Sequence, residues 1–299
     1  MRRKARRAVR RLRGPMRRQC GTMQVHFRLL EMDPGFRARQ SALEQATARR
    51  MAMAPAKWKV VTIPTVVHVV HHTSAENISV AQVKSQITVL NRDYRKKNPD
   101  RTKVPSVWSG LAADVGVKFK LVKITRTHTS RTSFGDDDSV KSAARGGVAP
   151  WPTSKYLNVW VCTLGGGLLG YAQFPGGPAA TDGVVILNTG FGTAGTAAAP
   201  FNRGRTATHE IGHWLNLRHI WGDTEDCSGS DLVPDTPNAA GPNFGKPGFP
   251  HVTCGNGPNG DMFMNYMDYV DDDAMFMFTT GQTARMHAAL QGPRKSLPK

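Results

Sequence analysis

The sequence predicts an α/β fold (α+β) built on one sheet, and two observations support this. Short β-branched and aromatic runs alternate with segments of helical periodicity, as in domains whose sheet is covered by helices. After residue 219 the chain becomes rich in Gly, Pro, Asp and Asn, so its C-terminal part should be loop-rich. With 299 residues and 39% apolar content, the chain can form one sizeable domain or two lobes.

Five segments have the composition of strands, because they are short, rich in β-branched or aromatic residues, and bounded by turn residues. They are residues 60–70, 115–124, 156–164, 170–174 and 184–187. Cys162 lies in the third of these, and we interpret it as a small buried apolar residue rather than a reactive thiol.

Three helices are expected besides the one discussed next. The first begins at Asp33-Pro34, which has the form of an N-cap followed by a proline at the first helical position. The second begins with the capping box of Ser79. Its expected buried face is Val80, Val83, Ile87, Leu90 and Tyr94. The third spans residues 280–290, and we interpret His287 there as a surface or packing residue.

One stretch, His209-Glu-Ile-Gly-His213-Trp-Leu-Asn216-Leu-Arg-His219, has the residues and spacing that a catalytic zinc ion requires. On a helix, His209 and His213 project from one face. His219 can join them only if the chain turns, and Asn216 tolerates the left-handed conformation that such a turn needs. Three imidazoles leave one zinc position open for water, and Glu210 is placed to act as its general base.

A bare His-Glu-x-x-His also occurs on surface helices, but a second motif follows it here. Asn265-Tyr-Met267-Asp-Tyr269 resembles the methionine-containing turn beneath the zinc site of metzincin peptidases. Together with CGTMQVHFRLL, LNVWVC, GLLGYAQFPGG, DTP and MFMFTTGQTARM, it makes the chain similar to the pappalysin-type metzincins, which include ulilysin-like proteases. The resemblance implies a twisted mixed sheet with two long helices in an upper lobe, a loop-rich lower lobe, and the active cleft between them. Asn216 departs from the glycine that metzincins generally place there.

The resemblance also implies roles for individual residues of a zinc endopeptidase made as a latent zymogen. Glu210 would take the proton of the attacking water, Tyr269 would stabilise the oxyanion, and Met267 would support the site without binding metal. Cys20 would be the fourth zinc ligand in the latent form; the alternative is a reduced thiol without function. The segment 170–174 would be the edge strand that pairs with substrate backbone.

The expected domain boundaries follow from the same comparison. Residues 1–55 form a basic N-terminal arm and inhibitory pro-segment, and residues 56–299 form the catalytic domain. Its upper lobe covers about residues 56–219 and its lower lobe about 220–299. We interpret Arg49-Arg50 and the Met-Ala-Met-Ala-Pro run after them as an exposed linker at the maturation boundary.

The loop-rich lower lobe needs stabilisation other than an apolar core. In the family, Cys227 and Cys254 would form a disulfide, worth roughly 3 kcal/mol in the chain-entropy model. A second bridge of the family is absent, since Lys246 and Ala274 occupy its positions. The oxygen-rich residues of this region would by themselves indicate a solvated acidic loop, but with the resemblance to the family we favour a calcium site. Its candidate ligands are Asp231, Asp235 and Thr236, near Asp223, Glu225 and Asp226.

The uneven distribution of charge along the chain indicates an alternative function. The formal net charge is +18, and residues 1–50 hold 15 of the 40 Lys and Arg but only three of the 22 acids. The arm from Arg2 to Arg18 can bind nucleic acid or be a solvated tail. We favour the tail, because no aromatic residue or recognition helix accompanies the arginines. A non-catalytic nucleic-acid-binding protein with a structural zinc is the alternative, and Glu210 argues against it because a structural site needs no base.

Location and specificity are the last expectations. No apolar segment suggests a membrane span and no signal peptide is visible, although the family is secreted. Asp271-Asp-Asp273 is either a solvated bend or part of a substrate pocket. In the second interpretation, which the resemblance to the family implies, Asp273 would bind the residue after the scissile bond and select Arg, less often Lys. Physiological substrate, export route and oligomeric state are not determined by these patterns.

Overall fold

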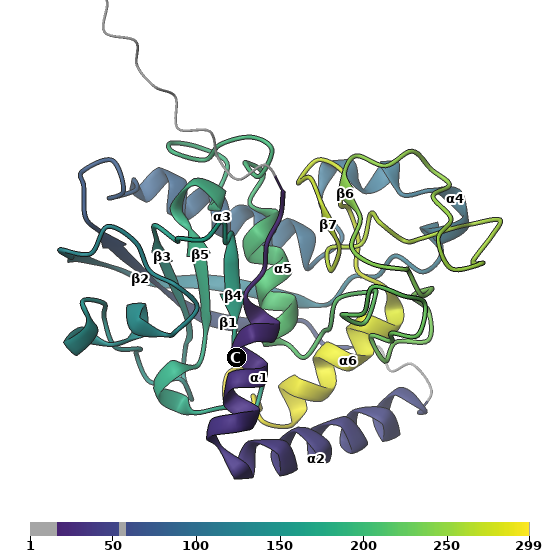
Figure 1. Ribbon diagram of the computed structural model, residues 1–299, viewed down its shortest axis with the longest axis horizontal. Coiled ribbons are helices and arrows are strands. Elements are labelled where there is room, and N and C mark those ends of the chain that lie inside the picture. The colour runs from purple at the N-terminus through teal and green to yellow at the C-terminus, as the bar shows by residue number, and fades with distance from the viewer. Residues whose placement is uncertain (1–16, 54–57, 299) are drawn as a thin grey trace, which may run out of the picture.

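A five-stranded sheet forms the centre of the protein (Figure 1). The computed structural model describes residues 17–53 and 58–298. The strand order is β2-β1-β3-β5-β4, and only β4 at the edge is antiparallel to its neighbour. The strands are β1 (Val61–His71), β2 (Val117–His128), β3 (Leu157–Cys162), β4 (Gly170–Ala172) and β5 (Val184–Leu187). All five lie within the predicted segments or a few residues from them, and the expected mixed sheet is confirmed.

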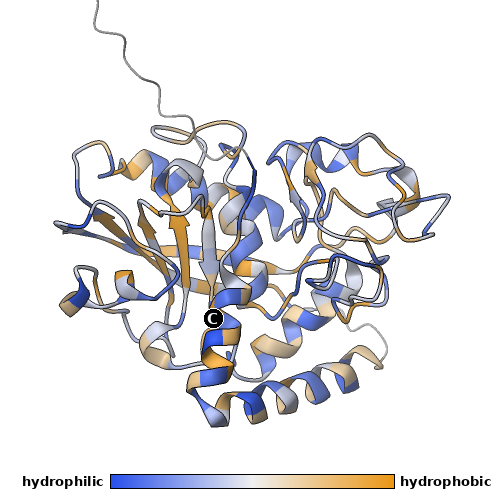
Figure 2. Ribbon diagram, in the orientation of Figure 1, coloured by the Kyte–Doolittle hydropathy of each residue, from blue (hydrophilic) through white to orange (hydrophobic). Residues whose placement is uncertain are grey.

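Apolar layers cover both faces of the sheet, which explains why its central strands are among the most hydrophobic parts of the chain (Figure 2). On one face, Val67 and Val69 of β1 pack with α3 (Val80–Asp93) and α5 (Arg205–Trp214). On the other, Val70 and Trp160 pack with Val25 of α1 (Thr22–Met32). Cys162 belongs to this second layer and is 1% exposed, which confirms its interpretation as a buried apolar residue.

Helix α3 starts at Ser79 as predicted, but only half of the capping box forms. The Ser79 hydroxyl accepts a hydrogen bond from the Gln82 backbone N–H. The Gln82 side chain is instead buried and donates to the carbonyls of Asn188 and Phe191, which joins α3 to the loop after β5. The predicted buried face is wrong at Val80, which is 47% exposed in the first turn of the helix.

Residues 17–53, which we call the N-terminal segment, form two helices where one was predicted. Helix α2 (Pro34–Met51) begins as expected, with the Asp33 carboxylate accepting from the backbone of Gly35 and Phe36. Helix α1 was not predicted, since its N-cap, Gly21, makes no side-chain capping bond. The predicted linker is wrong at Arg49-Arg50, which lie in the last turn of α2. The end of the linker, residues 54 and 55, lies outside the described chain.

Residues 220–279 are mostly loops, as expected, and lie on the opposite side of α5 from the sheet (Figure 1). They contain only the two short strands β6 (Phe244–Gly245) and β7 (Tyr269–Val270), which pair in parallel. The predicted Cys227–Cys254 disulfide is present, with Cα atoms 5.5 Å apart.

The chain ends in α6 (Thr280–Gln291), which packs against α2 and has a complete capping box. His287 on this helix is a packing residue, because it is 4% exposed and its Nε2 bonds the Val115 carbonyl. Of the helices in the described ranges, none is long and apolar enough to cross a membrane. The remaining short elements are α4 (Ser106–Ser109) and the 3-10 turns Pro99–Lys103, Ser139–Lys141, Ala143–Arg145, Ala179–Thr181 and Asn188–Gly190.

Candidate active site

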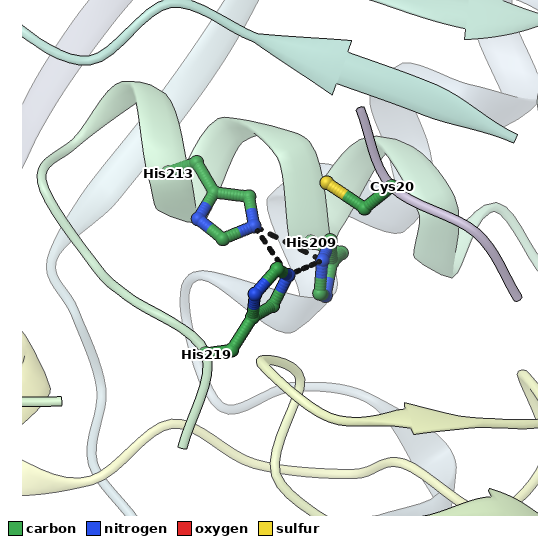
Figure 3. A group of neighbouring side chains, drawn as sticks. All are labelled: Cys20, His209, His213 and His219. Carbon is green, nitrogen blue, oxygen red and sulfur yellow. Dashed lines mark hydrogen bonds between the residues drawn. The ribbon is translucent and has the colours of Figure 1, made fainter. Parts of the chain in front are cut away.

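The three predicted zinc-binding histidines converge on one point (Figure 3). His209 and His213 project from α5 and His219 from the segment after it. Their Nε2 atoms are 3.0 to 3.3 Å apart, close to the spacing of tetrahedral ligands at ~2.0–2.1 Å from zinc. Burial lowers the pKa of His209 and of His213 well below the ordinary value. These two imidazoles are therefore neutral and offer lone pairs to a metal.

Each imidazole is aimed by a hydrogen bond on its other nitrogen. The partners are oxygen atoms that can only accept, so each Nδ1 carries the proton and each Nε2 is free. The acceptors are the Tyr266 carbonyl for His209 (2.7 Å), the Leu217 carbonyl for His213 (2.8 Å) and the Asp223 carboxylate for His219 (2.5 Å). The residues present thus fit a catalytic zinc ion.

The turn between His213 and His219 forms as the sequence predicted. Asn216 has φ 77°, in the left-handed region, and its N–H bonds the His213 carbonyl. Two buried arginines of the C-terminal segment hold the carbonyls at this end of α5. Arg294 Nε donates to Trp214 O and Arg285 Nε donates to Asn216 O, each at 2.7 Å.

The methionine turn lies directly against the zinc helix. A Cβ at Gly212 would lie 2.4 Å from the Met267 sulfur, so a glycine is required where the thioether packs. The hydroxyl of Tyr266, the residue before Met267, accepts a hydrogen bond from Arg205 at the start of α5. Tyr269 stands edge-on to His219, with ring centroids 4.9 Å apart. Met267 therefore supports α5, and Tyr269 lies beside the metal-binding nitrogens.

Cys20 and Glu210 meet at the same place. The Cys20 sulfur and the three Nε2 atoms all lie within 4.8 Å of one another (Figure 3). The Glu210 Oε2 atom is 3.3 Å from this sulfur and also accepts a hydrogen bond from the Thr22 hydroxyl at 2.9 Å. Burial raises the pKa of Glu210 to about 7, opposed by the bonds from Thr22 and Cys20. Both predicted residues are thus in the site.

The N-terminal segment reaches this position by pairing with the edge of the sheet. Gly21 N–H donates to Gly170 O and Leu169 N–H donates to Gln19 O, each at 2.9 Å. Cys20 and Gly170 form a parallel bridge. Strand β4 is therefore the edge strand, as expected for residues 170–174, and the N-terminal segment occupies it.

Arg18 was assigned to a solvated tail, and this is wrong: the residue is 1% exposed. Its Nη2 atom lies 2.6 Å from the Asp272 carboxylate, Nη1 donates to the Thr206 hydroxyl and Nε donates to the Val270 carbonyl. The carboxylate of Asp272 is otherwise bonded by the backbone N–H groups of Arg203 and Arg205, which precede and begin α5. Residues 1–16 of the arm lie outside the described chain.

Asp273, the predicted substrate-binding acid, has other contacts than its neighbour Asp272. It is 29% exposed and its Oδ2 lies 2.7 Å from Lys246 Nζ. The two neighbouring carboxylates thus point to different surroundings, Asp272 to the buried guanidinium and Asp273 to a lysine at the surface.

The candidate calcium ligands have partners within the protein. The Asp231 carboxylate accepts from the Thr236 hydroxyl at 2.7 Å, and burial raises the pKa of Asp231 to about 7. Asp235 accepts from Thr279 and Gly281 at the start of α6. Within the described ranges, the only close group of three or more His, Cys, Asp or Glu ligand atoms is the one containing Cys20. Calcium binding remains a prediction.

Comparison with known proteins agrees with this geometry. The profile of the family described as Pregnancy-associated plasma protein-A matches residues 143–291. An extracellular metalloprotease of Arthroderma otae is 35% identical over 242 residues, 78% of this chain and 79% of that one. Another, from Coccidioides posadasii, is 35% identical over 82% of this chain and 81% of that one.

The chain belongs to the pappalysin family of metzincins. It is a zinc metalloendopeptidase.

Solved structures of the same family extend the likeness to the N-terminal segment. Mature mirolysin of Tannerella forsythia with a cleaved peptide is 48% identical, with a TM-score of 0.79 over 80% of this chain and 96% of that one. A promirolysin mutant is 44% identical, with a TM-score of 0.85 over 94% of this chain and 97% of that one. The promirolysin structure thus covers a larger share of this chain than mature mirolysin does. The pappalysin-type metzincin fold is confirmed.

Several residues of this pappalysin site were missed by the sequence analysis. Asp223 was grouped with the calcium candidates, although its place four residues after His219 suits an orienting acceptor. Thr22 stands two residues after Cys20, at the first position of α1, and its sequence position alone did not indicate that its hydroxyl faces Glu210. For Arg18 and Asp272 no local signal exists, since they are 254 residues apart.

The turn before His219 leads to a test on Asn216. Asn216→Val should lose zinc and stability, because a β-branched residue at positive φ costs about 1–3 kcal/mol. Asn216→Gly should resemble wild type. Zinc content after dialysis against a chelator and thermal unfolding would measure both effects; a valine variant that retains zinc like wild type would contradict the role of the turn.

Proposed function

We propose that this zinc endopeptidase is secreted as a latent zymogen in which His209, His213 and His219 bind the metal. The observation that carries this proposal is the convergence of three oriented imidazoles, the Glu210 carboxylate and the Cys20 sulfur. The extracellular relatives support secretion. Zinc, when bound, polarises the scissile carbonyl and lowers the pKa of the attacking water.

The chain's own residues supply the remaining steps. Glu210 follows the first histidine and faces the position where Cys20 lies, so without the N-terminal segment its carboxylate is placed to take a proton from water. It then gives this proton to the leaving amine. The free edge of β4 would pair with the substrate backbone. Tyr269, beside His219, is placed to donate its hydroxyl proton to the developing oxyanion.

In the latent form the N-terminal segment covers all these groups. Its backbone pairs with β4, and the Cys20 sulfur, which lies with the three imidazole nitrogens, would be a fourth ligand for the metal. We therefore assign residues 17–53 to the inhibitory pro-segment. Its removal would free both the strand edge and the metal.

Glu210→Ala tests the general base. We expect the variant to retain zinc, because all ligands and their acceptors remain, and to lose peptidase activity by about 10⁴-fold or more. Zinc content and casein hydrolysis would be measured together after an added protease has removed the N-terminal segment from both proteins, because the variant is not expected to remove it itself. Activity near that of wild type would refute the mechanism.

We also propose a preference for Arg, less often Lys, after the scissile bond, with Asp272 rather than Asp273 as the selecting acid. The support is the guanidinium of Arg18, which is buried and bonded to Asp272, Thr206 and Val270. Leaving a buried carboxylate unpaired is costly, so a substrate arginine that replaces Arg18 would be favoured.

The two adjacent acids allow a matched test of this preference. Asp272→Asn keeps the oxygen that accepts from the backbone at α5 but removes the charge, and we expect the preference for Arg to fall about 100-fold. Asp273→Asn should leave it unchanged. Sequencing the products of a peptide library would decide; an Asp272→Asn enzyme with intact preference, or an effect confined to Asp273→Asn, would contradict the assignment.

A further inference from the structure

The N-terminal segment touches Glu210 with two side chains, and only one of them is accounted for by metal binding. Cys20 lies at the metal position, whereas Thr22 lies on the carboxylate of Glu210. We propose that Thr22 is a second inhibitory contact of the zymogen, which holds the general base while Cys20 blocks the metal. This inference rests on the proposed function of Glu210.

The Thr22 hydroxyl accepts one hydrogen bond and donates another. Thr22 is 0% exposed. The N–H of Ala172 donates to its Oγ1 at 2.8 Å, so the hydroxyl proton is left for another acceptor. That acceptor is Glu210 Oε2 at 2.9 Å. A hydrogen bond from a hydroxyl to a buried carboxylate is about twice as strong as one between neutral groups.

With metal bound, Thr22 and Cys20 would act on different atoms, although both contact Glu210 Oε2 in this structure. The thiol of Cys20 can donate to Glu210 Oε2, but a thiolate bound to metal has no proton to donate. In that state Thr22 is the hydroxyl donor that remains on this oxygen. The metal and the base are therefore restrained by separate side chains of one short segment.

Glu210 cannot readily turn away from Thr22, because the backbone of β4 lies against its other side. A Cβ built on Gly170 would be 2.9 Å from Glu210 Cγ and 3.0 Å from its Oε1. The carboxylate is thus confined between β4 and the hydroxyl. Loss of the hydroxyl should release one oxygen toward the position that water needs.

The test compares Cys20→Ala with the double variant Cys20→Ala/Thr22→Val in the full zinc-loaded chain. In both proteins the metal position is open, so the remaining latency reports the hold on Glu210. We expect the double variant to cleave itself about tenfold faster, as the loss of a hydrogen bond to a charged group predicts. Intact-mass spectrometry over time gives the rates.

Two controls separate this effect from weaker packing of the segment. Thr22→Ser keeps the hydroxyl. Thr47→Val makes the same chemical change at a buried threonine of α2 whose hydroxyl has no partner among the described residues. Both, added to Cys20→Ala, should cleave like Cys20→Ala alone. Equal rates for Cys20→Ala and the Thr22→Val double variant, or equal acceleration by Thr47→Val, would overturn the proposal.

Hydrogen exchange of the Ala172 amide gives a second readout that does not depend on catalysis. With Cys20 intact, Thr22→Val should speed this exchange about tenfold over wild type, because the amide loses its acceptor, while Thr47→Val should not. An unchanged exchange rate of the Ala172 amide would overturn the proposed contact between this amide and the Thr22 hydroxyl. Absence of self-cleavage in every variant, with the exchange difference present, would instead overturn the peptidase function and with it the inhibitory role.

Discussion

The metal-binding site depends on three hydrogen bonds that lie behind the metal-facing nitrogens. Their acceptors belong to three separate parts of the chain: the carbonyl before Met267, the carbonyl after Asn216, and the side chain of Asp223. The site therefore exists only when α5, the turn after it and the methionine turn are correctly placed. The Met267 sulfur packs directly against Gly212, so the methionine turn and α5 are in close contact. These hydrogen bonds fix the orientation of the imidazoles, which limits the reorganisation that metal binding requires.

The N-terminal segment contacts the same site from the side on which the substrate would bind. Between Arg18 and Thr22 it offers a guanidinium to a buried carboxylate, a sulfur to the metal position, a hydroxyl to the general base and a backbone edge to β4. Its backbone runs parallel to β4, opposite to the antiparallel partner β5 on the other side of that strand. The helices that follow add apolar contacts, since Val25, Leu29 and Phe36 belong to the core beneath the sheet.

Local physics explains what could be predicted from the sequence. The spacing of His209 and His213 and the conformational tolerance of Asn216 depend on a few neighbouring residues, and both were predicted. The start of α1 lacks a capping side chain and was missed. Asp272 faces Arg18 and Asp273 faces Lys246, and this difference depends on the direction of each side chain in a bend, which composition does not encode. Arg18 looked like part of a charged tail because its partner lies far along the chain.

That separation has a consequence for the order in which the molecule forms. Arg18 and Asp272 are 254 residues apart, and Cys20 and Thr22 reach a helix about 190 residues later. Closing loops of this length costs entropy that is recovered only when the receiving surface is already present. The contacts of residues 18–22 are therefore expected to form late in folding, although these residues precede the catalytic elements in the chain. If the segment inhibits the enzyme as we propose, the inhibitor reaches its position only after the elements that it covers have formed.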